Sequence, residues 1–324
     1  MNKADLESTP NVERAGLRKV RRSALLFFAA QGTGVIVWWC LLVFYPESRL
    51  FFVLEPNRET SLLAFWLPDL LFMAVGSLVA AVLIGQRNKY SVAAMWLVTG
   101  AVSYAALYTS AFVLMTDRGW WGVVLMLPSM LWSGVFATSL TVENDMFRQA
   151  RATSTNYVLL KTFTQIAVVW TLILVVFPYL ITLVEAKLGF PRLEFAYQRP
   201  LAVVIFIAIS SVGVWAAFVM SRVGKGTPLP LDHAVDLVVV GPYRYVRNPM
   251  AVSGIGQGLA VALFLGSPLV AVYALMGSAI WQLIFRPLEE DDLAERFGPQ
   301  YVEYAKAIRC WIPHRSGYKA KPPP

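Results

Sequence analysis

The residues that decide the fold are 239–250, VVGPYRYVRNPM, followed by the apolar run 251–285 and by the charged segment 286–313, RPLEEDDLAERFGPQYVEYAKAIRCWIP. The apolar run contains no charged residue and is too long for one ordinary membrane span. Gly-Ser-Pro at 266–268 lies near its middle, where a helix is expected to end and the chain to reverse. We therefore predict two antiparallel helices of roughly 17 residues, each about 25 Å long.

A hairpin of this kind returns the chain to the side of the membrane from which it started. Arg247, Asn248 and Pro249 enter the hairpin, and Glu289 and Glu290 leave it, so these residues are expected to meet. Charged side chains brought together at a membrane boundary from distant parts of a sequence indicate a functional site.

The composition excludes a water-soluble fold. Hydrophobic residues make up 57% of the 324 residues, charged residues make up 15%, and the mean hydropathy is +0.57. These values are typical of a polytopic membrane protein. The net charge of +8 would suggest nucleic acid as the partner of a soluble chain. Here the basic residues lie in short loops and tails, as the positive-inside rule describes, so we expect no nucleic-acid partner.

The sequence predicts an all-α integral membrane protein with about eight transmembrane helices. The hairpin supplies two of them, and earlier apolar runs lie near residues 23–45, 62–85, 91–115, 120–142, 163–184 and 200–221. We divide the chain into an N-terminal transmembrane region, 1–195, with about five spans of unassigned function, and a core, 196–324, with a C-terminal cytoplasmic helix and tail. The sequence does not indicate an oligomeric state.

The distribution of Lys and Arg among the loops predicts the orientation. Most of them lie in the N-terminal segment, in the loops near 87–89, 148–161 and 222–247, and in the C-terminal tail. Both termini and the mouth of the hairpin are therefore expected in the cytoplasm, where charged soluble cofactors are available. The expected location is a bacterial inner membrane or another membrane that faces the cytoplasm.

The same region resembles a known family. GPYRYVRNPMAVSG at 241–254, the hairpin, RPLEEDDLAERFG at 286–298, and the pair Tyr301 and Tyr304 are similar to the isoprenylcysteine carboxyl methyltransferase and phospholipid methyltransferase superfamily, over about residues 200–313. The family pattern is an Arg-His-Pro segment that opens a helix, a hydrophobic stretch and a Glu-Glu pair. The resemblance implies a membrane methyltransferase that binds S-adenosylmethionine at the cytoplasmic mouth of the hairpin and methylates a lipid-like or lipidated acceptor.

The residues at the mouth offer the groups that this cofactor needs. By the resemblance and by charge, Arg247 and Glu289 are the candidate catalytic residues, and Arg247 would pair with a carboxylate of the cofactor or the acceptor. The other candidates would bind the cofactor, by contacting its ammonium group, its ribose or its adenine ring, or by leaving a helix face without side chains. These candidate cofactor-binding residues are Tyr243, Asn248, Pro249, Gly254, Gly258, Glu290, Tyr301 and Tyr304. No spacing of His and Cys predicts a metal site.

The chain departs from the family pattern at two positions. Asn248 stands where the family usually has His, and Ala251 stands where it usually has Tyr. Because Asn does not titrate, no base remains in the motif itself, unless burial raises the pKa of Glu289 or Glu290. A carboxylate is already ionised near pH 7 and needs no base. We infer a mild preference for a carboxylate acceptor.

The same residues could also have purely structural roles, and the sequence leaves these alternatives open. The acidic run 289–292 would also suit the first turn of a solvated helix, and Arg244 would suit a positive-inside anchor. The glycines would suit helix packing, and the two tyrosines would suit the membrane interface.

Two other functions stay open as well. One is an NADPH-dependent membrane reductase of the sterol-reductase type, although Ile255 follows Gly254 where that type commonly has an acidic residue. The other is a transporter or another non-enzymatic membrane protein, for which Asp69, an ionisable residue inside the second span, is the candidate. The structural alternative is a span that starts later, with Asp69 capping it at the membrane interface.

Overall fold

The computed structural model describes residues 14–53, 59–142, 148–149, 164, 167–224, 232–233 and 236–318. These residues are mostly helical, and their strands are one parallel pair of two-residue strands, β1 (Arg148–Gln149) and β2 (Asp232–His233). Seven described segments are long and apolar enough to cross a membrane: Ala15–Phe44, Glu59–Gly85, Ser91–Thr116, Trp120–Thr141, Ala167–Lys187, Gln198–Gly224 and Pro268–Ala307. The predicted all-α fold of a polytopic membrane protein is confirmed.

The eighth predicted span, α10 (Pro249–Leu265), is an apolar helix of 17 residues. It is shorter than the other seven, yet it reaches about 25 Å. The first span differs from the prediction in another way, because it begins at Ala15 and takes in the basic residues at 18–22. Lys and Arg are good helix formers, and their long side chains reach water from a helix end, so the cluster extends the helix.

The chain folds as two compact units. The first comprises Met1–Tyr108, Leu125–Glu143 and Gln282–Asp292, and the second comprises Thr109–Val124, Asn144–Trp281 and Leu293–Pro324. The predicted division near residue 195 stays a prediction.

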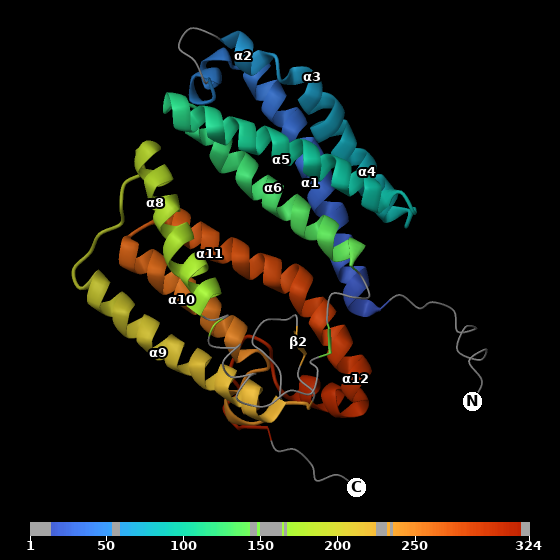
Figure 1. Ribbon diagram of the computed structural model, residues 1–324, viewed down its shortest axis with the longest axis vertical. Helices are drawn as coiled ribbons and strands as arrows, with labels where there is room; N and C mark the ends of the chain where they lie inside the picture. Colours follow the sequence, from blue (N-terminus) through green and yellow to red (C-terminus); the bar gives the residue numbers. More distant parts are fainter. Residues whose placement is uncertain are drawn as a thin grey trace. The chain divides into compact units, whose positions relative to one another are not determined.

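The first unit is built on α1 (Ala15–Phe44), which packs along the π-helical segment η3 (Asp69–Val75) and α4 (Gly76–Gly85) (Figure 1). Its other elements are the 3-10 turn η2 (Pro46–Phe51), the short helices α2 (Glu59–Leu63) and α3 (Trp66–Pro68), and most of α5 (Ser91–Thr116) and α6 (Trp120–Thr141).

Gln31 of α1 is the centre of a polar cluster in this unit. Its amide donates a hydrogen bond to Ser77 of α4 at 3.0 Å, and its carbonyl oxygen accepts from Ser129 and Ser133 of α6 at 2.8 and 3.0 Å. Side-chain hydrogen bonds of this kind hold helices together where lipid removes the hydrophobic driving force.

The first unit also contains the start of α12 (Arg286–Ala307). Asp291 of α12 accepts hydrogen bonds from the backbone N–H groups of Gly16 and Leu17, at 2.6 and 3.2 Å. A carboxylate at this place satisfies N–H groups that have no partner inside α1 and is favoured by the helix dipole. A Cβ atom on Gly16 would collide with the carbonyl oxygen of Pro287, so only glycine allows this approach.

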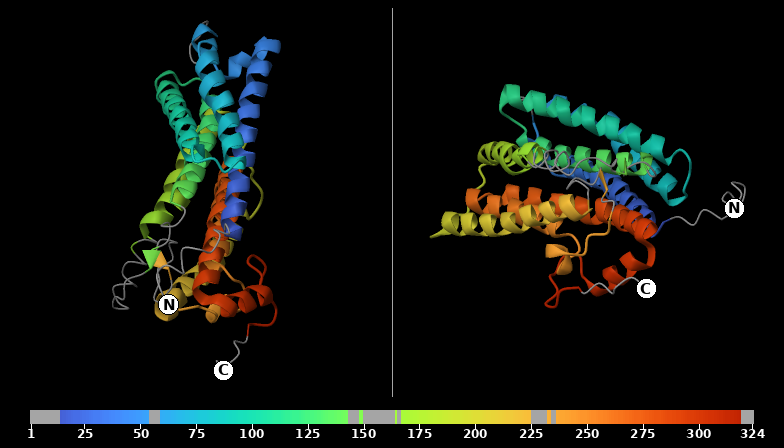
Figure 2. Two further views of the ribbon diagram at one scale, coloured as in Figure 1. Left: turned by 90° about the vertical axis from the view of Figure 1, so that its right-hand side faces the viewer. Right: turned by 60° about the horizontal axis from the view of Figure 1, so that its bottom comes forward.

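The second unit is built on α9 (Gln198–Val219), α10 and α11 (Pro268–Ile280). Figures 1 and 2 show these three helices side by side, with α10 packed against both of the others. The other elements are η4 (Leu172–Val176), α8 (Phe177–Lys187), η5 (Met220–Gly224), η6 (Gly241–Arg244) and the part of α12 after Asp292. The segment η7 (Trp281–Phe285) belongs to the first unit except for Trp281.

The predicted hairpin is present, and its turn is the one predicted. Gly266 ends α10 in the left-handed conformation with φ of 64°. Ser267 then caps α11, because its side chain accepts from the N–H of Val270 at 3.1 Å, and Pro268 takes the first helical position. The second arm is longer than predicted, since α11, η7 and α12 form one helical segment, Pro268–Ala307, kinked at Gly298.

Candidate functional site

The motif residues form a short loop and the first turn of α10. At the start of the loop, Gly241 has φ of 59°, and a Cβ atom there would lie 2.9 Å from Val219 of α9, so glycine lets the loop run close to that helix. At the end of the loop, Asn248 caps α10. Its Oδ1 atom accepts from the N–H of Ala251 at 3.0 Å, and Pro249 occupies the first helical position. Asn is among the best residues for this task, so the departure from the family pattern has a structural role.

The C-terminal segment 304–318 runs along this loop and binds it. The hydroxyl of Tyr304 donates to the carbonyl oxygen of Tyr243 at 2.5 Å, and the N–H of Arg247 donates to the carbonyl oxygen of Arg309 at 3.1 Å. Two further backbone bonds follow, from His314 to Tyr245 at 2.7 Å and from Tyr318 to Arg244 at 2.9 Å. The sequence did not predict these contacts, because most of them are made by backbone groups that every residue carries.

Arg247 lies beside two predicted tyrosines. It is half-buried, and its Nη1 atom lies 3.5 Å from the hydroxyl of Tyr301, which is a long hydrogen bond. Tyr301 and Tyr304 are buried with Ile308 in one cluster, with their ring centroids 6.5 Å apart. Together with the loop contact of Tyr243, the structure therefore brings four of the predicted site residues into one region of the second unit.

The two predicted glycines of α10 have different surroundings. A Cβ atom on Gly258 would lie 3.1 Å from the Cβ atom of Ala274, so this glycine serves the packing of α10 against α11. A Cβ atom on Gly254 would meet nothing closer than Trp170, at 4.0 Å. Of the two positions, Gly254 is the one that leaves room for a bound molecule.

Gln257 forms a polar chain that was not predicted. Its side-chain oxygen accepts from the indole N–H of Trp170 at 2.6 Å, and its amide donates to the hydroxyl of Ser210 on α9 at 2.8 Å. The side chain is buried in an apolar region, where an amide needs such partners. A single amide within an apolar helix is the sequence signal that would have identified it.

Glu289 and Glu290 belong to the first unit, whereas the other predicted site residues belong to the second. Both are half-buried on α12. Glu290 forms an ion pair with Arg286, one helical turn earlier, at 2.9 Å. The predicted meeting of these acids with Arg247 stays a prediction.

The part of the site in the second unit suits S-adenosylmethionine. Arg247 offers a planar cation to a carboxylate, with which it would form a shorter and stronger bond than its 3.5 Å contact with Tyr301. The aromatic rings of Tyr301 and Tyr304 lie beside Arg247 in a buried cluster, and the space at Gly254 admits a close approach to α10.

Comparison with known proteins found one family. Residues 198–300 match the family model described as phospholipid methyltransferase. No curated protein and no solved structure gave a significant match. The matched residues include α9, the motif loop, the hairpin and the acidic pair, while Tyr301 and Tyr304 lie just beyond them. The match confirms the resemblance drawn from residues 200–313 and supports a membrane methyltransferase in general.

Proposed function

We propose that this chain is an S-adenosylmethionine-dependent methyltransferase that modifies a lipid-like or lipidated acceptor. The observation that carries the proposal is the match of residues 198–300 to the phospholipid methyltransferase family. The chain is an integral membrane protein, and seven helices in its described part are long and apolar enough to cross a membrane, so an acceptor dissolved in the bilayer is within reach of it.

In this proposal the motif loop binds and orients the reactants. S-adenosylmethionine, when bound, supplies an electrophilic methyl group on a sulfonium sulfur, so catalysis depends mainly on holding the acceptor in line with it. Arg247 binds a carboxylate through its guanidinium group, and Tyr301 and Tyr304 flank the base. Tyr243, Asn248 and Pro249 hold the loop and the start of α10 in place. Gly254 leaves space beside α10 for the cofactor, and Gly258 lets α10 pack closely against α11.

The acidic pair completes the proposed site. Glu289 and Glu290 follow directly on the second arm of the hairpin, as the family pattern has them. We assign to them the ammonium and the ribose hydroxyls of the cofactor, with Glu289 also orienting the reacting groups. Arg286 fixes the carboxylate of Glu290 on α12 and thereby limits its choice of conformations.

A carboxylate is the acceptor that we favour. The side-chain oxygen of Asn248 is occupied by the cap of α10, and an amide does not take up a proton. An amine or thiol acceptor would need a base, whereas a carboxylate is ionised near pH 7. On the predicted orientation the site and both termini face the cytoplasm, which suits a bacterial inner membrane or another cytoplasm-facing membrane.

Calorimetry on the protein in lipid nanodiscs tests the cofactor. We expect saturable binding of S-adenosylmethionine, no binding of NADPH, and a loss of affinity of about tenfold or more in Arg247→Gln and Glu289→Gln. Two matched controls, Arg222→Gln and Glu303→Gln, change exposed residues of η5 and α12 and are expected to bind like the wild type. Unchanged affinity in Glu289→Gln would remove that residue from the site, and binding of NADPH alone would make the protein a reductase.

Transfer of a labelled methyl group into membrane lipid extracts tests the acceptor. A methyl ester releases its label as volatile methanol on treatment with mild base, whereas methyl groups on nitrogen or sulfur are not released as methanol and stay non-volatile. We expect base-labile label. Stable label would show that the acceptor is not a carboxylate, even where cofactor binding is confirmed.

A further inference from the structure

The first unit contains a groove of about 420 Å³ between α1 and the segment that runs from α2 to η3. The side chains around it are apolar, and they include Val35, Trp39, Cys40, Phe44, Leu63 and Trp66. Phe44 is 74% exposed and Trp66 is 53% exposed, so the groove opens at the surface of the unit. A groove of this kind in a membrane protein suits a hydrocarbon chain.

A buried acidic residue, Asp69, forms a hydrogen bond with a side chain that lines this groove. Asp69 is 3% exposed and lies at the start of η3, directly after Pro68. Its Oδ2 atom accepts from the indole N–H of Trp39 at 3.1 Å, and Trp39 lines the groove. Asp69, which the sequence singled out inside the second span, therefore fixes an aromatic side chain of the groove.

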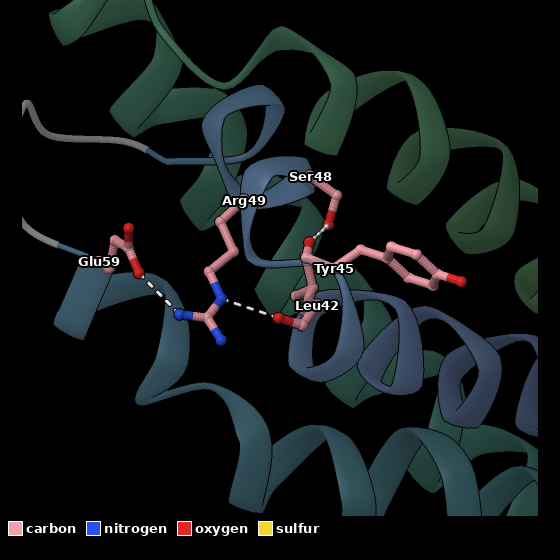
Figure 3. Close-up of polar contacts among 5 residues, drawn as sticks. All are labelled: Leu42, Tyr45, Ser48, Arg49 and Glu59. Carbon is pink, nitrogen blue, oxygen red and sulfur yellow. Dashed lines mark hydrogen bonds and ion pairs between the residues drawn. The ribbon is translucent and has the colours of Figure 1, made fainter.

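A pair of opposite charges lies at the end of the groove. Arg49 of η2 reaches between the end of α1 and the start of α2 (Figure 3), where its Nε atom donates to the carbonyl oxygen of Leu42 and its Nη1 atom to Glu59, both at 2.8 Å. Leu42 directly precedes the groove residue Val43, and Glu59 lies one helical turn before the groove residue Leu63. The Arg49–Glu59 pair therefore lies next to the apolar side chains that line the groove.

The pair is suited to a headgroup that carries both charges. A guanidinium has five N–H donors, and among the described residues Arg49 uses its donors on Leu42 and Glu59, which leaves N–H groups for a phosphate. The Arg49 side chain is 18% exposed and the Glu59 side chain is 48% exposed, so the cation lies deeper than the anion. A zwitterionic phospholipid has the matching order, because its phosphate is attached nearer to the chains than its ammonium group.

We propose that this groove binds a zwitterionic phospholipid as a resident lipid, with one acyl chain along Trp39 and Trp66, the phosphate on Arg49 and the ammonium group at Glu59. The site is independent of the proposed methyl transfer. An apolar groove alone would take any hydrocarbon chain, and the charged pair selects the headgroup.

Native mass spectrometry of the protein released from nanodiscs tests the headgroup. The nanodiscs contain equal parts of phosphatidylethanolamine, phosphatidylcholine and phosphatidylglycerol, and we expect the two zwitterionic lipids to be retained over phosphatidylglycerol. Arg49→Gln is expected to reduce all retained phospholipid by about tenfold. Glu59→Gln is expected to retain phospholipid but to lose the preference over phosphatidylglycerol. Retention without any headgroup preference in the wild type would overturn the proposal.

Two substitutions on α1 test the groove itself. Cys40→Phe fills the groove and is expected to reduce lipid retention, whereas Val37→Phe, at an exposed position outside the lining, is expected to leave it unchanged. Equal retention in both variants would place the lipid elsewhere.

Alkylation of Cys40 in the wild-type protein tests whether lipid fills the groove without any substitution that could unfold the protein. Cys40 is exposed and Cys310 is buried, so alkylation by N-ethylmaleimide reports on Cys40. We expect slower alkylation in nanodiscs that contain zwitterionic lipid than in nanodiscs of phosphatidylglycerol alone. Equal rates would contradict the proposal.

Discussion

At the scale of single residues, the side chain of Asn248 accepts a hydrogen bond from an N–H group at the start of α10 that has no backbone partner within the helix. Its Oδ1 atom satisfies the N–H of Ala251. We expect Asn248→Ala to lower the free energy of unfolding by about 1 kcal/mol, the usual effect of removing such a cap. Asn248→Asp keeps an acceptor oxygen and serves as the control. Both are measured by denaturation in mixed micelles, followed by circular dichroism. Equal stability of Asn248→Ala and the wild type would contradict the role.

Asp117, in the loop between α5 and α6, predicts a dependence of stability on pH. A hydrogen bond from Lys187 at 2.6 Å, and a second from Trp120 at 2.9 Å, hold the pKa of Asp117 below its usual value of 3.8. Since the folded pKa is the lower one, this contribution to stability is present above the unfolded value and is lost as the pH falls through the folded value.

We therefore expect Asp117→Asn to be less stable than the wild type at neutral pH, and the difference to shrink in acid, below about pH 4. Lys187→Gln should give the same pattern, and added salt should weaken it, because both side chains are exposed. Thermal unfolding at a series of pH values measures the difference. A difference that grew on acidification would refute the assignment.

At the scale of elements, the approach of α12 to α1 requires a glycine. A Cβ atom on Gly16 would meet the backbone of Pro287 and the carboxylate of Asp291, whereas a Cβ atom on Gly34 of the same helix would meet nothing within 4 Å. We expect Gly16→Ala to cost about 1–3 kcal/mol of unfolding free energy. Gly34→Ala is the matched control and is expected to be neutral or slightly stabilising, because alanine favours the helix. Equal effects of the two substitutions in the same denaturation experiment would show that α12 does not pack against Gly16.

The elements also show what the sequence was able to predict. The turn at Gly266, Ser267 and Pro268 was predicted correctly because each residue acts on its own backbone or on a close neighbour. The hydrogen bonds from Gly16 to Asp291 and from Arg247 to Arg309 were missed. Contacts of that kind depend on which distant segments meet, and no local pattern of residue types records them.

At the scale of the whole molecule, the number of spans determines which side each end faces. If α10 crosses the membrane as an eighth span, both ends lie on the same side. Single cysteines in a cysteine-free background, labelled with an impermeant maleimide, test this. We expect Gln86→Cys and Ser316→Cys to react from the cytoplasmic side and Arg118→Cys from the other side. Labelling of Ser316→Cys from the side of Arg118→Cys would mean that α10 does not cross.

The class of the whole molecule was available from composition, and the candidate residues came from the family pattern around Arg247. The pattern did not reveal how the tail binds the loop, nor that Gly258 packs against Ala274 while Gly254 has space beside it. Those facts depend on side-chain and backbone positions in the folded chain, which residue order alone does not determine.

The contact of Gly16 with Asp291 also sets an order of assembly. The two residues are 275 positions apart, and a ribosome that adds about 5–20 residues per second needs tens of seconds to pass from one to the other. Throughout that time the first helix resides in the bilayer without its carboxylate partner. The first unit is therefore completed only after Asp291 has been synthesised, and a chain that stops before Asp291 cannot close it.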